Sequence, residues 1–472
     1  MKRLNLIAIL LFILGFVSKT FALEIVYPKA NDVKINSPVT FFIGNDKPDS
    51  NLTINNEKVK IHPSGGFYHV VKLNSGENIF NVENANGEKQ LYRIFRPNFI
   101  VQSASTVKPI IYKSPIYVRV KNNNSPLRSE PSDSGLNRLQ HLQKGTYLAI
   151  IGEYGKFYKT QLARDDYAWI EKSLVINENL QSPVLAKMIS YTYENTAAFE
   201  RYNIKLSDKV PYVLNERVSF EHINNKYEAF SKGLDLTIYN VDSQPENKFE
   251  LEINSKEKLF GYDSYYTASN ELIITIKKIP QVSDNQPLKN IKVTLDPGHG
   301  GSEYGAIGCL GHKEKDINLA IALKAKEYLE KKGAIVSLTR NEDFDLGLYQ
   351  RVEMSKAFDS DIFISIHSNA LPDALAQTYR SGTSVYYFYP QSNDLAKIML
   401  ETLTKELGTN NDKVRQESFA VIRNTSSPAI LIEIGYMINP EDNSKLITPE
   451  FQTKAGQAIA NGLENYISGL SK

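Results

Sequence analysis

The chain has 472 residues, which is too long for one ordinary core and predicts three or four domains. A formal net charge of +2, without a long basic run, argues against a nucleic-acid-binding surface. The contents of 42% apolar and 10% aromatic residues predict packed domains and argue against a disordered chain.

Residues 1–22 have the pattern of a cleaved export signal. Lys2 and Arg3 precede an apolar run from Leu4 to Val17, and small residues follow near Ala22. The run is shorter than the roughly 20 residues that cross a bilayer, so we prefer an export signal to a membrane anchor. We therefore expect an exported protein, in a periplasm or a cell wall, with no stable membrane span after cleavage.

Residues 23–98 read as short strands separated by turns. Apolar residues recur at every other position around Val39, Phe41 and Ile43, and Asn-Gly or Gly-Gly turns interrupt the pattern. We expect a small immunoglobulin-like β-sandwich here.

Two further β-rich regions follow. Over residues 112–178 the motifs are Tyr117-Val118-Arg119-Val120, Pro126 to Pro131 and Asp166-Tyr167-Ala168-Trp169-Ile170. Their order resembles the bacterial Src-homology-type barrels of cell-wall enzymes, and we expect Trp169 in the core. Residues 183–280 close on Gly261-Tyr262-Asp263 followed by Leu272-Ile273-Ile274-Thr275-Ile276, and this region looks like the wall-targeting β-domain that often precedes exported amidases.

After the polar linker 281–287, strand-like runs alternate with helical ones. This predicts an α/β domain over residues 288–472, with a mainly parallel sheet and helices on both faces. In its first helix, Asp316 is the expected N-cap and Gly333 the expected end.

Two histidines stand at the ends of predicted strands in this domain. His299 follows the strand that begins at Ile291, within a Pro-Gly-His-Gly-Gly turn, and His367 ends the apolar run that begins at Ile362. The carboxyl ends of parallel strands lie along one edge of a sheet, so both imidazoles are expected there.

Glu433 lies inside the apolar run from Ala429 to Tyr436. An unpaired ionised group would cost several kcal/mol there, so a partner is expected. The partner could be an arginine, with Arg340, Arg351 and Arg423 as candidates. Alternatively, Glu433 faces a metal-bound water and serves as its base.

Two histidines and one carboxylate make a catalytic zinc site, because three protein ligands leave a position for water. We assign His299, Glu314 and His367 as ligands of Zn²⁺. His312 is the rival to Glu314 or His367, and Cys309, the only cysteine, is expected to be packed. A single cysteine also excludes an internal disulfide.

The motifs of this domain follow one another in the order of a known family. They are Leu295-Asp296-Pro297-Gly298-His299-Gly300-Gly301, Gly311 to Leu319, Leu338-Thr339-Arg340, Ile364 to Ala370 and Ile432-Glu433-Ile434-Gly435-Tyr436. From about Ile291 to the C-terminus the chain resembles the zinc-dependent N-acetylmuramoyl-L-alanine amidases. Ser368, Ile434 and Tyr436 replace commoner family residues without removing a reactive group.

The resemblance implies hydrolysis of the amide between N-acetylmuramic acid and L-alanine in peptidoglycan, in wall remodelling or daughter-cell separation. It also implies His299, Glu314 and His367 as zinc ligands and Glu433 as the catalytic glutamate. Only Leu371 to Arg380 fills the gap where activator-gated members carry a longer helical insert, so a blocking helix is not expected.

Asn369, Arg351 and Arg423 are candidates for orienting ligands or holding acidic parts of the stem peptide, with structural bonds as the alternative. We expect peptidoglycan as the partner of a monomer, and divisome or activator proteins are candidate further partners. The alternative functions are a non-catalytic wall-binding scaffold and a zinc peptidase that cuts within the stem peptide.

Overall fold

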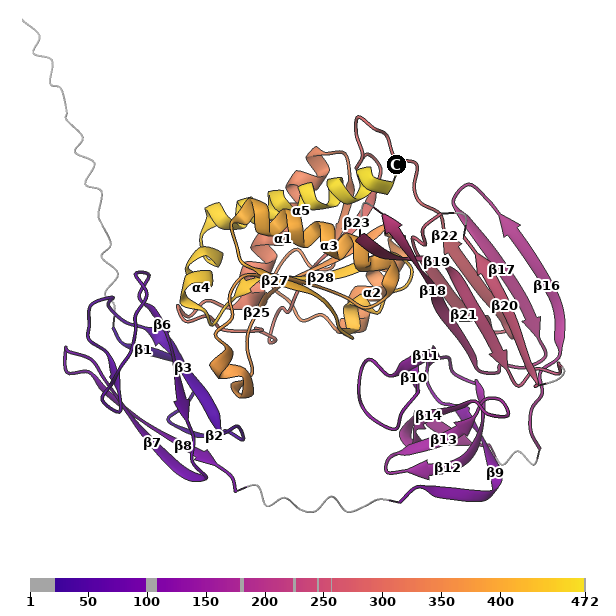
Figure 1. The fold of residues 1–472 in the computed structure, drawn as a ribbon, viewed down its shortest axis with the longest axis horizontal. Helices are drawn as coiled ribbons and strands as arrows, with labels where there is room; N and C mark the ends of the chain where they lie inside the picture. The colour runs from indigo at the N-terminus through magenta and orange to yellow at the C-terminus, as the bar shows by residue number, and fades with distance from the viewer. Residues whose placement is uncertain are drawn as a thin grey trace, which may run out of the picture.

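A computed structural model of the protein describes residues 22–98, 108–178, 182–223, 226–243, 246–255 and 257–470. The predicted export signal falls almost wholly outside these residues. Within them, no helix combines the length and the apolar character needed to cross a membrane. Figure 1 shows three β units around a larger unit of strands and helices, so the all-β prediction for the N-terminal region is confirmed.

The first β unit consists of two sheets, ordered β1-β3-β6 and β2-β8-β7-β4-β5. Phe42, Phe67 and Ile94 are completely buried between them, as expected where every other strand residue faces a core. The strands are β1 (Glu24–Tyr27), β2 (Asp32–Lys34), β3 (Val39–Asn45), β4 (Thr53–Ile54), β5 (Glu57–Lys58), β6 (Gly66–Lys72), β7 (Gly76–Glu83) and β8 (Lys89–Arg96).

The second β unit is a single sheet with the order β11-β10-β14-β13-β12-β9-β15. Ala168 and Ile170 are completely buried, and Trp169 between them is only partly buried, so its predicted core position is wrong. Alternation along the strand places Trp169 on the opposite face from its two neighbours. The strands are β9 (Ile110–Val120), β10 (Ser125–Arg128), β11 (Arg138–Leu142), β12 (Tyr147–Tyr154), β13 (Phe157–Gln161), β14 (Tyr167–Glu171) and β15 (Val175–Asn177).

The third β unit pairs a four-stranded sheet, β16-β17-β22-β21, with a three-stranded sheet, β18-β19-β20. Leu236, Ile253 and Ile274 are buried in its core. The strands are β16 (Met188–Asn195), β17 (Phe199–Leu206), β18 (Tyr212–Ile223), β19 (Lys226–Tyr239), β20 (Lys248–Asn254), β21 (Tyr262–Tyr266) and β22 (Glu271–Lys277).

The last unit is built on one six-stranded sheet with the order β24-β23-β25-β28-β26-β27. Neighbouring strands run parallel except for β26 and β28, which are antiparallel. The strands are β23 (Lys292–Pro297), β24 (Ile335–Leu338), β25 (Ile362–Asn369), β26 (Thr383–Tyr387), β27 (Asn411–Gln416) and β28 (Ala429–Tyr436). The α-helices are α1 (Glu314–Lys331), α2 (Leu348–Ala357), α3 (Asn393–Leu407), α4 (Pro440–Leu446) and α5 (Pro449–Leu470).

The two faces of this sheet carry different layers. Ile430, Ile432 and Ile434 of β28 share one core with α1, α3 and α5. Ala429 and Leu431 point to the other face, where they pack with the short 3-10 helix η4 (Ala420–Ile422), which also contacts α2. Because side chains alternate along a strand, Glu433 points to the face covered by α2 and η4.

Helix α1 starts earlier than its sequence suggested. Lys313 occupies the N-cap position and Glu314 is the first helical residue, so the assignment of Asp316 as N-cap is wrong. As the first helical residue, Glu314 also contacts Ala306 and Ser368 through its side chain, as described below. The predicted end is confirmed, because Gly333 follows the helix with a φ of +90°.

The units contact one another directly. In the segment after β25, the 3-10 helix η2 (Asp373–Thr378) packs on β3 of the first unit. Asp373 accepts hydrogen bonds from the hydroxyls of Tyr27 and Thr40, at 2.9 and 2.6 Å. On the other side, the Tyr262 N–H of the third unit donates to the Thr425 carbonyl at 2.7 Å.

Candidate metal centre

Three side chains converge at the carboxyl edge of the sheet. His299 follows β23, His367 lies near the end of β25, and Glu314 begins α1, which packs against both strands. One possible ligand atom from each residue lies within 4.8 Å of the other two. His367 Nδ1 is 3.0 Å from Glu314 Oε1, and His299 Nε2 is 3.3 Å from Glu314 Oε2. The structure therefore brings together the three residues assigned as ligands.

The backbone around His299 is shaped to permit this approach. His299 has a φ of +62°, in the left-handed region that costs a non-glycine residue roughly 1–3 kcal/mol. A Cβ on Gly298 would lie 2.2 Å from the His367 ring, and one on Gly305 would lie 2.3 Å from Glu314 Oε2. Glycine is thus required at both positions by close packing against the three converging groups.

Glu314 is buried and accepts several hydrogen bonds besides its histidine contacts. The backbone N–H of Ala306 donates to Oε2 at 2.8 Å, and Asn318 and the Ser368 N–H donate to Oε1 at 3.1 and 3.2 Å. Burial alone would raise its pKa, but hydrogen bonds and charge from His299 and His367 outweigh burial and lower the pKa of Glu314. Glu314 is therefore held as a carboxylate.

Glu433 lies directly beside the three residues, because it pairs with His367 in the β25–β28 ladder. Its side chain keeps some exposed surface, but its Oε2 atom is buried and has no hydrogen-bond partner within the described residues. Desolvation, and then the negative charge of Glu314, raise the pKa of Glu433 well above its ordinary value. A proton or a cation would satisfy this carboxyl group.

The arginines considered as partners of Glu433 are engaged elsewhere in the described part of the chain. Arg340 donates to the carbonyls of Pro297, Gly298 and Lys315. Arg351 donates to Asp296 Oδ1 at 2.8 Å and to the His299 carbonyl at 2.9 Å. These two guanidinium groups thus hold the loop that carries His299. Arg423 donates to the Ser418 carbonyl at 2.6 Å, so an ion pair between Glu433 and any of the three arginines is not observed among the described residues.

The supporting residues Asp296, Asn318 and Ser365 were not assigned roles from the sequence. Asp296 is completely buried and accepts hydrogen bonds from Arg351, Thr339 and Ser365. The sequence contained one indication of the role of Asn318. This residue lies four positions after Glu314 and therefore on the same face of the helix.

The other sequence candidates lie outside the converging group. Arg351 is buried in its pair with Asp296, which is the structural alternative considered for it. Asn369 lies two residues beyond His367 and is partly exposed, and Arg423 follows η4 at a cavity described below. His312 is exposed, whereas Cys309 is buried beside the first β unit, and burial raises the pKa of its thiol to about 12.

The donor chemistry of the convergent group fits a zinc ion. Two imidazole nitrogens and one carboxylate oxygen are a ligand set of catalytic zinc sites. Glu433 Oε2, which has no partner among the described residues, supplies a further unsatisfied acceptor beside that set. His299, Glu314 and His367 are therefore the residues that would hold the ion.

Comparison with known proteins adds independent information. The family profile described as N-acetylmuramoyl-L-alanine amidase matches residues 293–465. The germination-specific N-acetylmuramoyl-L-alanine amidase of Bacillus subtilis is 32% identical over 199 residues, which cover 39% of this chain and 82% of the relative. The probable cell wall amidase LytH of Staphylococcus epidermidis is 36% identical over 190 residues, which cover 40% of this chain.

The match to LytH covers 62% of that relative's own length. Among solved structures, the catalytic domain of CwlV from Bacillus (Paenibacillus) polymyxa is 34% identical, with a TM-score of 0.35, over 37% of this chain and 97% of that one. Residues 293–465, which the family profile matches, contain His299, Glu314, His367 and Glu433. Through this last unit, the chain belongs to the N-acetylmuramoyl-L-alanine amidase family.

Proposed function

We propose that this protein hydrolyses the amide bond between N-acetylmuramic acid and the L-alanine of the peptidoglycan stem peptide, with zinc as its cofactor. The observation that carries the proposal is the convergence of His299, Glu314 and His367 within 4.8 Å, beside the unpartnered carboxyl group of Glu433. The family and the Bacillus subtilis relative, both described as N-acetylmuramoyl-L-alanine amidases, agree with this assignment.

When bound, Zn²⁺ would supply a Lewis acid for the scissile carbonyl and would lower the pKa of water towards 7. His299, Glu314 and His367 would hold the ion, and Arg351 and Arg340 fix the loop that presents His299. Asn318 and the Ser368 N–H orient Glu314 through its Oε1 atom. The supporting shell thus fixes ligand orientation before substrate arrives.

Glu433 is the proposed general base. Its raised pKa has two causes, desolvation and the charge of Glu314, and a cation held by Glu314 would offset the second. Glu433 would then accept a proton from the attacking water and return it to the leaving amine. A positioned base of this kind typically contributes 10²- to 10⁴-fold in rate.

The three β units would hold the enzyme on the wall. We infer an immunoglobulin-like unit over 23–98, a Src-homology-type barrel over 112–178 and a wall-targeting unit over 183–280. With the predicted export signal, they support a location in the cell wall or periplasm. A monomeric state, and divisome or activator partners, stay predictions.

The direct test is digestion of purified peptidoglycan, followed by mass spectrometry and by assay of newly exposed N-terminal alanine. We expect stem peptides freed from sugar, with loss of activity in a chelator. Glu433→Gln should keep zinc but lose hydrolysis by about 10²- to 10⁴-fold, whereas His299→Ala should lose both.

Each alternative has a distinct outcome in this assay. Muropeptides still joined to sugar but cut within the peptide would indicate a zinc peptidase. Sedimentation of the protein with the wall, without released products, would indicate a scaffold. Wild-type zinc content and activity in His299→Ala would refute the ligand assignment.

A further inference from the structure

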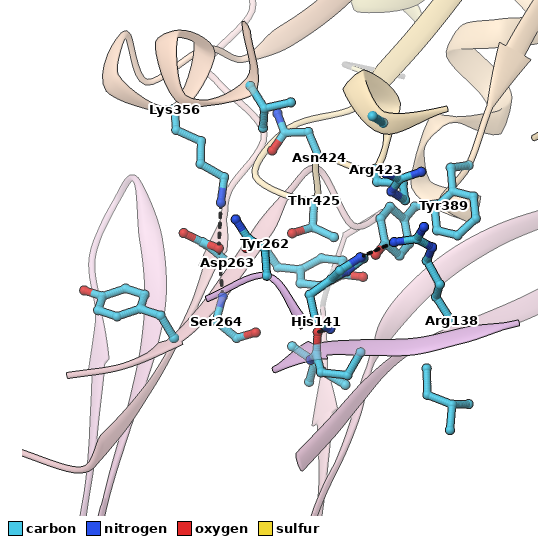
Figure 2. A pocket seen from close by; sticks show the side chains of 18 of the residues that line it. Arg138, His141, Tyr262, Asp263, Ser264, Lys356, Tyr389, Arg423, Asn424 and Thr425 are labelled. Atoms are coloured by element: carbon cyan, nitrogen blue, oxygen red, sulfur yellow. Dashed lines mark hydrogen bonds and ion pairs between the residues drawn. The ribbon is translucent and has the colours of Figure 1, made fainter. Parts of the chain in front are cut away.

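A cavity of about 810 Å³ lies where the second β unit, the third β unit and the catalytic domain meet. Figure 2 shows Arg138 and His141 approaching from strand β11, Tyr262 and Asp263 from the third unit, and Tyr389 and Arg423 from the catalytic domain. No one unit forms the cavity alone. Its volume is in the range of pockets that enclose a small organic ligand, roughly 300–1,000 Å³.

Two guanidinium groups in this cavity have no carboxylate partner among the residues that the structure describes. Arg138 Nη1 lies 3.0 Å from His141 Nε2, and the Arg138 Nε atom is buried without a hydrogen-bond partner. Arg423 donates to the Ser418 carbonyl at 2.6 Å and to the Ser418 hydroxyl at 3.2 Å. In the described part of the chain, the side-chain partners of these two arginines are His141 and Ser418, and no carboxylate pairs with either.

The positive charge of Arg423 acts on Arg138, and both charges act on His141. Partial burial, and then the charge of Arg423, lower the pKa of Arg138. Burial, followed by the charges of Arg138, Arg423 and Arg128, lowers the pKa of His141 to about 4. Like charges gathered in a partly desolvated place are unfavourable without a counter-charge, so this end of the cavity is suited to an anion.

The carboxyl groups of the cavity do not supply that counter-charge. Asp263 pairs with Lys356 at 3.3 Å, and Glu353 is exposed on α2. Glu216 is bound by the Gln391 N–H at 2.8 Å and by Ser231, and burial raises its pKa to about 7. The anion that would neutralise the two arginines must therefore come from a ligand.

We propose that this cavity binds a peptide bearing a free carboxylate, which Arg138 and Arg423 hold together across the domain boundary. Resting on the proposed function, that peptide is the stem peptide of peptidoglycan. The cavity is much larger than a single inorganic anion, and its tyrosines and amides suit a peptide backbone. The planar, forked donors of arginine match a carboxylate.

The cavity and the metal centre lie towards opposite ends of β28. The lining residues Phe388 and Tyr389 follow Tyr387, which pairs with Ile430 near the amino end of this strand, whereas Glu433 pairs with His367 nearer its carboxyl end. The catalytic-domain wall of the cavity includes α2 and the η4 segment, which cover the sheet face to which Glu433 points. A stem peptide held there would lie on the same face of the sheet as the site of hydrolysis. The second β unit would thus contribute Arg138 directly to substrate binding.

The test is calorimetric titration of the full-length, zinc-loaded protein with the dipeptide L-alanyl-D-glutamate. The same dipeptide with both carboxyl groups amidated, and inorganic phosphate, serve as comparison ligands. We expect one saturable site for the dipeptide and none for its diamide. Binding should persist in His299→Ala, which separates this cavity from the metal centre.

Arg138→Gln and Arg423→Gln should each weaken dipeptide binding by about 10- to 100-fold, the loss expected for a hydrogen bond between charged groups. Arg164→Gln, which changes an exposed arginine of the same β unit outside the cavity, should bind as the wild type does. The two cavity variants lie in different units, and circular dichroism would verify that each is folded. Unchanged affinity in a folded cavity variant would overturn the proposal.

Two further outcomes would also overturn it: absence of saturable binding, and binding of phosphate without binding of the dipeptide. Peptidoglycan digestion by the same preparations separates the two proposals. An active enzyme that does not bind the dipeptide would refute only the cavity assignment, and an inactive protein that binds it would refute only the amidase assignment.

Discussion

Replacing Arg351 with methionine would test how the metal centre is supported. The side chains of Arg351 and Asp296 are 3% and 1% exposed, and their closest N–O distance is 2.8 Å. A solvent-exposed pair would contribute only about 0–1 kcal/mol, whereas removing one partner of a buried pair typically costs 3–5 kcal/mol. Because the pair is buried, we expect a loss of 3–5 kcal/mol in stability, since Asp296 would be left as an uncompensated buried charge.

For a domain of this size, such a loss corresponds to a fall in melting temperature of roughly 6–20 °C. The effect should also reach the metal, because Arg351 donates to the His299 carbonyl at 2.9 Å. Scanning calorimetry of the full chain would follow the transition that shifts when Zn²⁺ is added. Zinc content after dialysis would report the second effect.

Two variants serve as controls for Arg351→Met. Lys331→Met breaks an exposed ion pair on α1 and should not move the transition. Combining Arg351→Met with Asp296→Asn should recover part of the stability, because the uncompensated charge is then gone. A folded Arg351→Met protein with wild-type melting temperature and zinc content would refute the reasoning.

Three further predictions concern packing, pH and metal. Gly298→Ala should lower retained zinc, because the new Cβ would lie 2.2 Å from the His367 ring, whereas Gly469→Ala, with open space around it, should not; metal analysis would decide. Glu216→Gln should stabilise the protein at pH 8 but not at pH 4, by at most roughly 3 kcal/mol. Burial raises the pKa of Glu216 from 4.5 to about 7, so the wild-type protein has its full stability below pH 4.5 and loses stability as pH rises through 7. Equal shifts in the melting temperature of Glu216→Gln at pH 4 and pH 8 would contradict this. Chelation of the metal should lower the melting temperature of one calorimetric transition. Adding Zn²⁺ at 100 times its Kd should restore about 2.7 kcal/mol of unfolding free energy.

The strands that carry the site could be found from the sequence because central strands are buried on both faces. Such strands show near-continuous apolar runs, and β28 has the bounds Ala429–Tyr436 that its run predicts. The position of a polar residue within or after such a run was then sufficient to single out His367 and Glu433. These two site residues could therefore be predicted from the local sequence pattern alone.

Features that depend on contacts between distant segments could not be found in this way. Asp316 has a suitable side chain for an N-cap, but α1 begins at Glu314, whose carboxylate is bound by Ala306, Asn318 and Ser368. The pairing of Arg351 with Asp296 joins residues 55 positions apart. Neither choice has a local signal in the sequence.

By itself, the sequence determined the strands that carry His299, His367 and Glu433 and the strand-end positions of the two histidines, since these follow from hydrophobic period and turn chemistry. The tertiary structure decided that Glu314 and not His312 joins those histidines, that Arg351 supports the loop, and that Arg138 and Arg423, from two units, line one cavity. The physical reason is that short-range atomic contacts arise only after segments distant in the chain have packed together.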